Sequence, residues 1–547
     1  MIAKKKSSRF NSINHDEILD LVIIGGGITG ASILWDATLR GMKSVLVEKN
    51  DFTSGTSQAT SKLIHGGLRY LKNGEISLVR ESLRERRILA KLTPHSIRPL
   101  GFQLPVYSLK NKIVLGLGLT LYDLLSYDKN FELNSDTIIP NHKFLDIATT
   151  QNLNENIYRE KLKGSFLYFD YANINPERHT SEFIFSAKNR GGRAFNYTEV
   201  ISFQKKDDLF EVEILDKLSK AKQILKSRTI VNASGPWADL VDGFSGKPSP
   251  TNLVRSKGIH VVLDCHFSPY THVVQTKEKT HLFIIPWRGK TILGTTDSIY
   301  KGDPDSFEVT KNDIWKLLEE ANEYINYPFT INSVKYFYGG MRPLVDDSRD
   351  SNSTETYSLS RKTSIEDHES SGLKGYFTAL GGKYTTSRNL AEKVVDKISV
   401  LLYGNKKSCL TENIPLDSGN FSDIPSLSSE LRKEFVGESI EKIYFLTQRY
   451  GSLTRKILNN KSNKKGDSFR LPNGEHFFEE EIEYSIKNEE IHFITDLLFR
   501  RSGIGTTGML SEYDWNKFVM IYLKYSGKKN IEKEIVREIQ KRYMLIP

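Results

Sequence analysis

The apolar residues of this chain fall into runs and periodic stretches that predict strands and helices in alternation. The run LDLVII at residues 19–24 is apolar apart from Asp20 and predicts a buried strand. Residues 27–41 follow with apolar side chains at helical spacing, and SVLV at residues 44–47 is a second apolar run. Together they predict a strand–helix–strand unit near the N-terminus.

Further strands are predicted in the middle of the chain, where apolar runs are bounded by glycine or proline: residues 164–171, 258–264, 281–287, 290–297 and 334–344. Helices are predicted at residues 77–92, 176–190 and 311–324, and the arginines of the first are expected on a solvated face. Residues 224–240 and 375–398 each read as strand, glycine turn and helix. Residues 345–372 read as a polar loop, and from about residue 401 the pattern is mostly helical.

The first glycine turn carries a nucleotide-binding signal. Gly25 to Gly30 matches GxGxxG, in which Gly25 permits a tight turn, Gly27 admits a pyrophosphate and Gly30 lets the helix pack against the strand. Glu48 follows about 20 residues later, where a carboxylate can bind ribose hydroxyls. We therefore predict dinucleotide binding. The turns at Gly235 and Gly381 could converge on the same ligand.

Composition narrows the class of protein. The chain has 547 residues, which predicts several domains, and a formal net charge of +10, which favours polyanionic partners or simply solubility. Two cysteines, Cys265 and Cys409, provide neither a disulfide framework nor a cysteine metal site, and we expect no metal. The basic N-terminus has no apolar core of a secretory signal, so residues 1–18 are expected to be a flexible tail.

No apolar run is long enough to cross a membrane. The most apolar stretch, residues 113–125, contains Asp123 and is expected in a domain core. It remains a candidate for membrane contact, together with the basic helices after residue 430.

Several motifs occur in an order that resembles one family. These are IGGGITG, GTSQATSKLIHGGLRY, VNASGPWAD, IIPWRGKTILGTTD, GGMRPL and LGGKYTTSRNLAEKV. The chain resembles the FAD-dependent glycerol-3-phosphate dehydrogenases, within the D-amino-acid oxidase-like flavoproteins. The resemblance implies an α/β plus α+β chain, in which a Rossmann-like FAD-binding domain is interleaved with an antiparallel-sheet substrate domain and followed by a mostly helical C-terminal domain.

We assign residues 19–95, 170–255 and 375–400 to the FAD-binding domain, residues 96–169 and 256–374 to the substrate domain, and residues 401–547 to the C-terminal domain.

The resemblance also implies the reaction. Glycerol 3-phosphate would be oxidised to dihydroxyacetone phosphate, a hydride would pass from C2 to the flavin N5, and a membrane quinone would take the electrons. The protein is then expected on the inner face of the cell membrane, where anionic lipid would attract it. An oligomer is possible. No nucleic acid is expected as a partner.

The resemblance assigns roles to residues. His65 and His260 are alternative bases for the hydroxyl proton. The substrate phosphate would be held by Arg69, Tyr70, Arg342, Arg361 and Lys383. Asp297 is expected to cap a turn and Trp237 to pack beside the cofactor. The predicted FAD-binding residues are Gly25, Gly27, Ile28, Thr29, Gly30, Glu48, Thr56, Ser57, Ser61, Lys62, Leu63, His65, Gly66, Gly67, Ala233, Gly235, Trp237, Gly381, Gly382, Lys383, Thr385 and Thr386.

Two other functions fit part of this pattern. An oxidase would use the same fold and substrate but pass electrons to oxygen. Some oxidases of the family carry a sizeable insertion before the GGK motif, and the loop here is too short for it, which favours the dehydrogenase. A non-catalytic or RNA-associated flavoprotein would need aromatic residues interleaved with a basic stripe, and the sequence has no convincing one.

Overall fold

A computed structural model describes residues 9–14, 16–247, 252–277, 281–345, 363–381, 383–460 and 466–544. Two predicted site residues, Arg361 and Gly382, lie outside this described part of the chain. The helices are α1 (Ile28–Leu39), α2 (Ile76–Leu92), α3 (Leu109–Leu125), α4 (Ile147–Leu153), α5 (Pro176–Lys188), α6 (Ala238–Gly243), α7 (Lys311–Asn322), α8 (Ser387–Tyr403), α9 (Ile424–Glu434), α10 (Ile440–Tyr450), α11 (Leu453–Asn459), α12 (Glu479–Asn488), α13 (Glu512–Ser526) and α14 (Lys533–Met544).

The first sheet has a parallel centre. Its strands are β1 (Ile18–Ile24), β2 (Ser44–Val47), β7 (Arg193–Phe195), β8 (Thr198–Lys206), β9 (Leu209–Asp216), β10 (Lys222–Asn232), β17 (Ser364–Asp367) and β18 (Tyr376–Leu380). Their order is β17-β18-β10-β1-β2-β7, and the β8–β9 hairpin extends β10. Helices α1, α5 and α8 pack together on one face. The β8–β9 hairpin packs against the other face of the sheet. Strands β1 and β2 are therefore buried on both sides.

The second sheet is largely antiparallel. It contains β3 (Leu63–Ile64), β4 (Ile97–Val106), β5 (Lys143–Leu145), β6 (Gly164–Asn173), β11 (Leu253–Leu263), β12 (Thr271–Gln275), β13 (His281–Trp287), β14 (Lys290–Gly294), β15 (Ser298–Ile299) and β16 (Val334–Val345). The predicted pairing of a Rossmann-like and an antiparallel sheet is confirmed. Two strands lie in the sheet opposite to the one that the predicted segments gave them. Strand β3, from the predicted FAD-binding segment, pairs with β6 in the second sheet, and β17, from the predicted substrate segment, pairs with β18 in the first.

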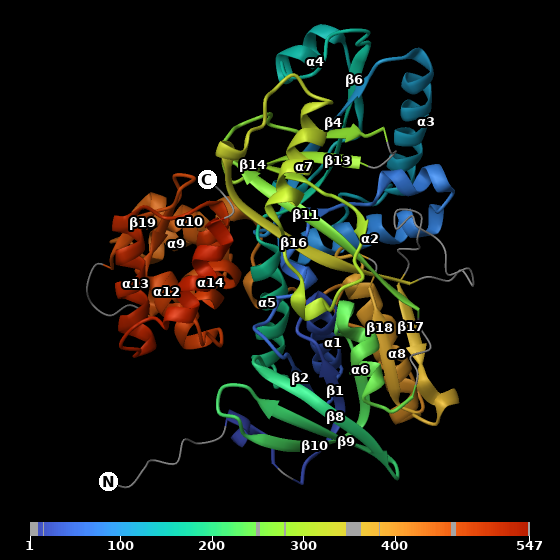
Figure 1. Ribbon diagram of the computed structural model, residues 1–547, viewed down its shortest axis with the longest axis vertical. Coiled ribbons are helices and arrows are strands. Elements are labelled where there is room, and N and C mark those ends of the chain that lie inside the picture. The colour runs from blue at the N-terminus through green and yellow to red at the C-terminus, as the bar shows by residue number, and fades with distance from the viewer. Residues whose placement is uncertain are drawn as a thin grey trace.

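The C-terminal part is mostly helical, as predicted. Helices α9 to α14 gather beside α5, and a short hairpin of β19 (Ser468–Arg470) and β20 (His476–Phe478) joins them (Figure 1). A π-helix at Asp496–Arg501 contacts α5 and carries two arginines, which reach Asp51 in the first domain. These contacts attach the C-terminal part to the segment that follows β2.

The structure contradicts the expectations for the N-terminal tail and for residues 113–125. Part of the predicted flexible tail is packed, because Phe10 is buried and its ring lies 5.4 Å from that of Phe195. The apolar stretch at residues 113–125 is not in a core. Helix α3 lies at the edge of the molecule (Figure 1), and most of its apolar side chains are exposed. Among the described residues, no helix is long and apolar enough to span a membrane.

Candidate active site

The three glycine turns meet at one edge of the first sheet. Strands β1, β10 and β18 are parallel neighbours, so the turns that follow them lie side by side. A Cβ atom on Gly25, whose φ is +112°, would lie 2.6 Å from the carbonyl oxygen of Ala233, which follows β10. A Cβ atom on Gly381 would lie 3.1 Å from the hydroxyl of Thr29 at the start of α1. The predicted convergence of the three turns is therefore present.

Glu48 lies directly beside the first turn. Its carboxylate accepts hydrogen bonds from the backbone N–H groups of Gly26 at 2.7 Å and Asn50 at 2.9 Å. Burial raises the pKa of Glu48, and the two N–H groups oppose that shift. Each carboxylate oxygen can still accept a second hydrogen bond. The carboxylate therefore has the fixed orientation and the acceptor capacity that a ribose hydroxyl requires.

The segment after Glu48 folds over the start of α1. The hydroxyl of Ser57 accepts a hydrogen bond from the N–H of Ile28 at 2.9 Å. Thr56 donates to the carbonyl of Met341 at 2.6 Å, which ties this segment to β16. Trp237 lies beside Gly55, and its indole N–H donates to Asp305 at 2.8 Å. Its packing beside the cofactor stays a prediction. These contacts surround the turn at residues 25–30 and do not fill it.

Residues 61–67 connect the two sheets. Ser61 is hydrogen bonded to His260 on β11, with 2.9 Å between Oγ and Nε2. Lys62 is buried and forms an ion pair with Glu177 on α5 at 2.9 Å. The N–H of Gly66 donates to the hydroxyl of Tyr122 on α3 at 2.9 Å. The segment is thus held at three points by three different elements.

The glycines of this segment are also required by the protein itself. A Cβ atom on Gly66 would lie 2.4 Å from Leu83 and 2.5 Å from the hydroxyl of Tyr122. Gly67 has a φ of +79°, and a Cβ atom there would lie 2.5 Å from the ring of Tyr70. The contacts with α2, α3 and Tyr70 are therefore one reason why these two positions need glycine.

The two candidate histidines differ in environment. His260 is fully buried, and its ring stacks on Tyr338 with 4.9 Å between centroids. Burial lowers the pKa of His260 to about 3, and the positive charges of Arg342 and Lys62 add to this. His65 is only half-buried. His260 is therefore a neutral ring with one nitrogen engaged by Ser61, and His65 is the more accessible of the two.

The predicted cations fall into two groups joined by residues 61–67. The guanidinium of Arg342 donates to Ser256 at 3.1 Å and to Thr295 at 2.7 Å. Asp297, expected only as a turn cap, lies 3.6 Å from it. In the second group, Lys383 Nζ lies 4.0 Å from the centre of the Tyr70 ring and donates to Ser82. Arg69 donates to the Tyr70 hydroxyl at 2.9 Å, so Arg69, Tyr70 and Lys383 form one cluster.

Sequence reasoning missed the support behind this site. Asp170 on β6 accepts a hydrogen bond from Tyr122 at 2.8 Å and forms a buried ion pair with Arg86. Arg86 was expected on a solvated helix face, but it is almost fully buried. The sequence did contain a sign that Arg86 is buried. Leu83 and Leu89, three residues before and after it, place Arg86 on the apolar side of α2.

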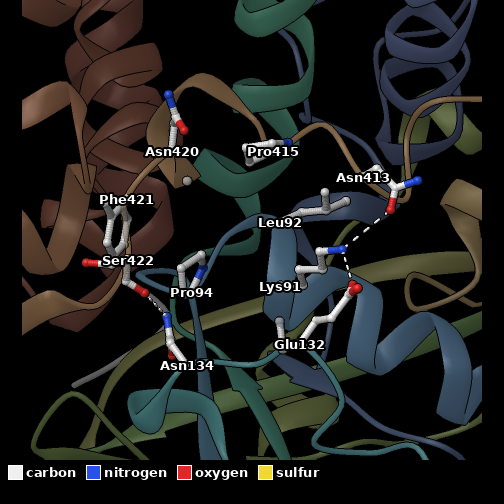
Figure 2. A pocket seen from close by; sticks show the side chains of 12 residues that line it. Lys91, Leu92, Pro94, Glu132, Asn134, Asn413, Pro415, Asn420, Phe421 and Ser422 are labelled. Atoms are coloured by element: carbon white, nitrogen blue, oxygen red, sulfur yellow. Dashed lines mark hydrogen bonds and ion pairs between the residues drawn. The ribbon is translucent and has the colours of Figure 1, made fainter.

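A hollow of about 380 Å³ lies elsewhere, between the end of α2 and the segment that enters the C-terminal part (Figure 2). Lys91 is paired there with Glu132, and Asn134 donates to the carbonyl of Ser422 at 3.0 Å. The residues that line it include neither the glycine turns nor the cations described above. The candidate active site is therefore the junction of the two sheets.

Comparisons with known proteins agree with this geometry. Residues 20–387 match the model of the FAD dependent oxidoreductases, and residues 409–524 match that of the C-terminal domain of alpha-glycerophosphate oxidase. The chain is 32% identical to a glycerol-3-phosphate dehydrogenase of Synechocystis over 509 residues, which are 89% of this chain and 88% of that protein. It is 31% identical to the aerobic glycerol-3-phosphate dehydrogenase of Escherichia coli, covering 89% and 94% of the two chains.

Solved structures show the same fold. The crystal structure of a glycerol-3-phosphate dehydrogenase from Bacillus halodurans complexed with FAD covers 97% of this chain and 96% of its own, with a TM-score of 0.75 and 25% identity. An L-alpha-glycerophosphate oxidase from Mycoplasma pneumoniae with FAD bound covers 73% of this chain with a TM-score of 0.51. At 15% identity, it is similar in fold alone.

The site and the comparisons lead to the same cofactor. The fixed carboxylate of Glu48, the open glycine turn and the three converging junctions fit a dinucleotide with an extended pyrophosphate. The model matched over residues 20–387 is that of FAD-dependent enzymes. The chain therefore belongs to the FAD-dependent oxidoreductases and, within them, to the glycerol-3-phosphate dehydrogenase family.

Proposed function

We propose that this protein oxidises sn-glycerol 3-phosphate to dihydroxyacetone phosphate and passes the electrons to a membrane quinone. The observation that carries the proposal is the two cation groups linked through residues 61–67, one at Arg342 and one at Lys383, which suit a small dianion beside a flavin. The relatives named above are glycerol-3-phosphate dehydrogenases, which supports the same substrate.

Arg342 and Lys383 would hold the phosphate. Arginine offers a planar fork to two phosphate oxygens, and lysine adds a second positive charge. Ser256 and Thr295 fix the guanidinium of Arg342, so less conformational freedom is lost when a phosphate binds. Arg69 and Tyr70 complete the cluster around Lys383. Arg361 stays a prediction because it lies outside the described residues.

Bound FAD supplies a hydride acceptor at its N5 atom. The proton of the C2 hydroxyl must leave at the same time, and a neutral imidazole nitrogen can accept it. We propose His65 for this role. His65 is half-buried, whereas the pKa of about 3 at His260 leaves that ring a weak base. His260 would instead orient Ser61, and Tyr122 would hold the N–H of Gly66, next to His65.

The electron acceptor separates two candidate functions. The family model over residues 409–524 takes its name from an oxidase, which is the observation in favour of oxygen. A quinone is confined to lipid, so that acceptor requires the protein to sit on a membrane, which we propose to be the inner face of the cell membrane.

One assay tests both functions. The purified protein is given glycerol 3-phosphate, and reduction of a dye and formation of peroxide are followed in parallel. Dye reduction with little peroxide supports the dehydrogenase. Peroxide formed in amounts equal to the dihydroxyacetone phosphate would show that the protein is an oxidase instead. No oxidation of glycerol 3-phosphate would refute both functions.

A further inference from the structure

We infer that Ser82 on α2 is a positioning residue for the substrate phosphate, because it fixes the ammonium group of Lys383. The inference rests on the proposed function, in which Lys383 is a phosphate ligand. None of the residues to which the sequence assigned a part in substrate binding belongs to α2. The polar side chains on the inward face of this helix therefore have a role that the proposed function has not yet used.

Ser82 faces Lys383 as a hydrogen-bond acceptor. Ser82 is fully buried on α2, and its hydroxyl donates to the carbonyl of Leu78, one turn earlier, at 2.8 Å. A hydroxyl has a single hydrogen, so the oxygen can only accept from its other neighbours. The ammonium of Lys383, which can only donate, lies 3.0 Å from this oxygen. The direction of the bond between the two side chains is therefore fixed.

The ammonium of Lys383 has neighbours on three sides. Besides Ser82, the centre of the Tyr70 ring lies 4.0 Å from Nζ, and a Cβ atom on Gly67 would lie 3.5 Å from it. An aromatic ring attracts a cation over its whole face, whereas a hydrogen bond has a defined direction. Ser82 therefore determines where above the Tyr70 ring the ammonium lies.

A buried ion pair holds α2 against the start of α8. Glu85, three residues after Ser82, accepts hydrogen bonds from Arg388 at 2.7 Å and 2.6 Å. Arg388 follows Lys383 by five residues, and both members of the pair are 1% exposed. A bidentate pair fixes the orientation of its two partners as well as their separation. The bond between Ser82 and Lys383 is thus formed between two segments that are already held together.

A fixed ammonium should favour binding more than catalysis. A mobile lysine loses side-chain freedom when it binds an anion, and Ser82 restricts that freedom before the substrate arrives. The phosphate takes no part in the hydride transfer, so Lys383 would contact it equally in the ground state and in the transition state. Loss of the Ser82 hydroxyl should therefore raise KM for glycerol 3-phosphate about 3- to 10-fold and change kcat less than about 2-fold.

The test measures binding of inorganic phosphate to the flavin-loaded protein by calorimetry, and KM and kcat by dye reduction. The test variant is Ser82→Ala. The matched control is Ser181→Ala on α5: Ser181 is also buried and donates to the carbonyl of Glu177 at 3.0 Å, and within the described residues it accepts no hydrogen bond from a lysine or arginine. We expect Ser82→Ala to weaken phosphate binding about 3- to 10-fold and the control to resemble the wild-type protein.

A second pair of variants separates positioning from a general effect on the fold. In Lys383→Met, which keeps the length of the side chain but removes the charge, a further Ser82→Ala substitution should change neither phosphate binding nor KM, because its partner is gone. Flavin content and melting temperature show that each variant is folded.

Four results would overturn the inference. They are unchanged phosphate binding and KM in Ser82→Ala, a loss confined to kcat, an equal loss when Ser82→Ala is added to Lys383→Met, and a wild-type protein that binds no phosphate. Dye reduction by the wild-type protein reports on the proposed function separately. If Ser82 and Lys383 bind phosphate together but glycerol 3-phosphate is not oxidised, only that function is refuted. If glycerol 3-phosphate is oxidised with an unchanged KM in Ser82→Ala, only the inference about Ser82 is refuted.

Discussion

Replacing Tyr122 by phenylalanine tests whether α3 positions the active-site loop. In the native protein, the Tyr122 hydroxyl accepts the N–H of Gly66 at 2.9 Å and donates to Asp170 at 2.8 Å. Burial raises the pKa of Tyr122 well above its usual value, and the charge of Asp170 adds to this. The phenol therefore stays protonated at any working pH. The variant removes only the oxygen and leaves the volume of the ring almost unchanged.

The cost follows from these two bonds. The N–H of Gly66 is buried, and a buried donor without an acceptor costs about 1–3 kcal/mol. Asp170 loses one donor but keeps its ion pair with Arg86, so its carboxylate is not left unpaired. The expected loss is therefore about 1–3 kcal/mol, divided between the stability of the folded protein and the binding of FAD, which corresponds to about 5- to 150-fold in an equilibrium constant.

The assay compares thermal unfolding and the FAD dissociation constant in the wild-type protein and two variants. Tyr168→Phe is the matched control: Tyr168 is also buried and its ring lies 5.9 Å from that of Tyr122. Within the described residues, we find no hydrogen bond from its hydroxyl. We expect the control to resemble the wild-type protein in both measurements. If Tyr122→Phe also left both unchanged, the Gly66–Tyr122 bond would not support the site.

Three further changes test the site itself. Gly27 replaced by leucine should abolish FAD binding, since the side chain would occupy the turn and its first atom would lie 3.1 Å from Ser57; a yellow, flavin-loaded variant would contradict this. Arg342→Ala should lower kcat/KM for glycerol 3-phosphate about 10- to 100-fold while FAD stays bound, and Arg342→Lys should recover part of the loss; equal oxidation of glycerol and glycerol 3-phosphate by the native enzyme would refute a phosphate clamp. His65→Gln should lower kcat by about 10²- to 10⁴-fold, the usual contribution of a general base, whereas His260→Gln should lower it less, because burial lowers the pKa of His260 to about 3 and leaves that ring a weak base; a larger loss in His260→Gln would reverse the assignment.

The nucleotide-binding half of the site could be predicted from the sequence because its rules are local. Gly25, Gly30 and Glu48 lie within one strand–helix–strand unit, and a backbone that turns sharply before a helix needs glycine whatever surrounds it. The substrate half could be predicted only through the family resemblance. Arg342 is fixed by Ser256, which is 86 residues away in the chain, and no local pattern reveals such a partner.

The two mistaken expectations about helices have a common cause. A periodic pattern separates two faces of a helix but does not say which one meets the protein. In α2, a buried acid on β6 draws Arg86 inward. In α3, the larger apolar face points outward, since Leu119 and Tyr122 already fill the contact with the core.

A buried carboxylate, Asp51, links the C-terminal part to the segment beside the cofactor site. Asp51, three residues after Glu48, is fully buried and is paired with Arg500 at 2.5 Å and Arg501 at 2.7 Å. Burial alone would raise the pKa of Asp51, but the two arginines outweigh it and lower the pKa to about 2. A buried charge is tolerated only with its partners, so the segment after β2 and the π-helix stabilise each other. Because the N–H of Thr53 donates to the carbonyl of Gly26 at 3.0 Å, this support reaches the glycine turn. The helical domain thus contributes to the cofactor site by holding the segment on which Glu48 depends.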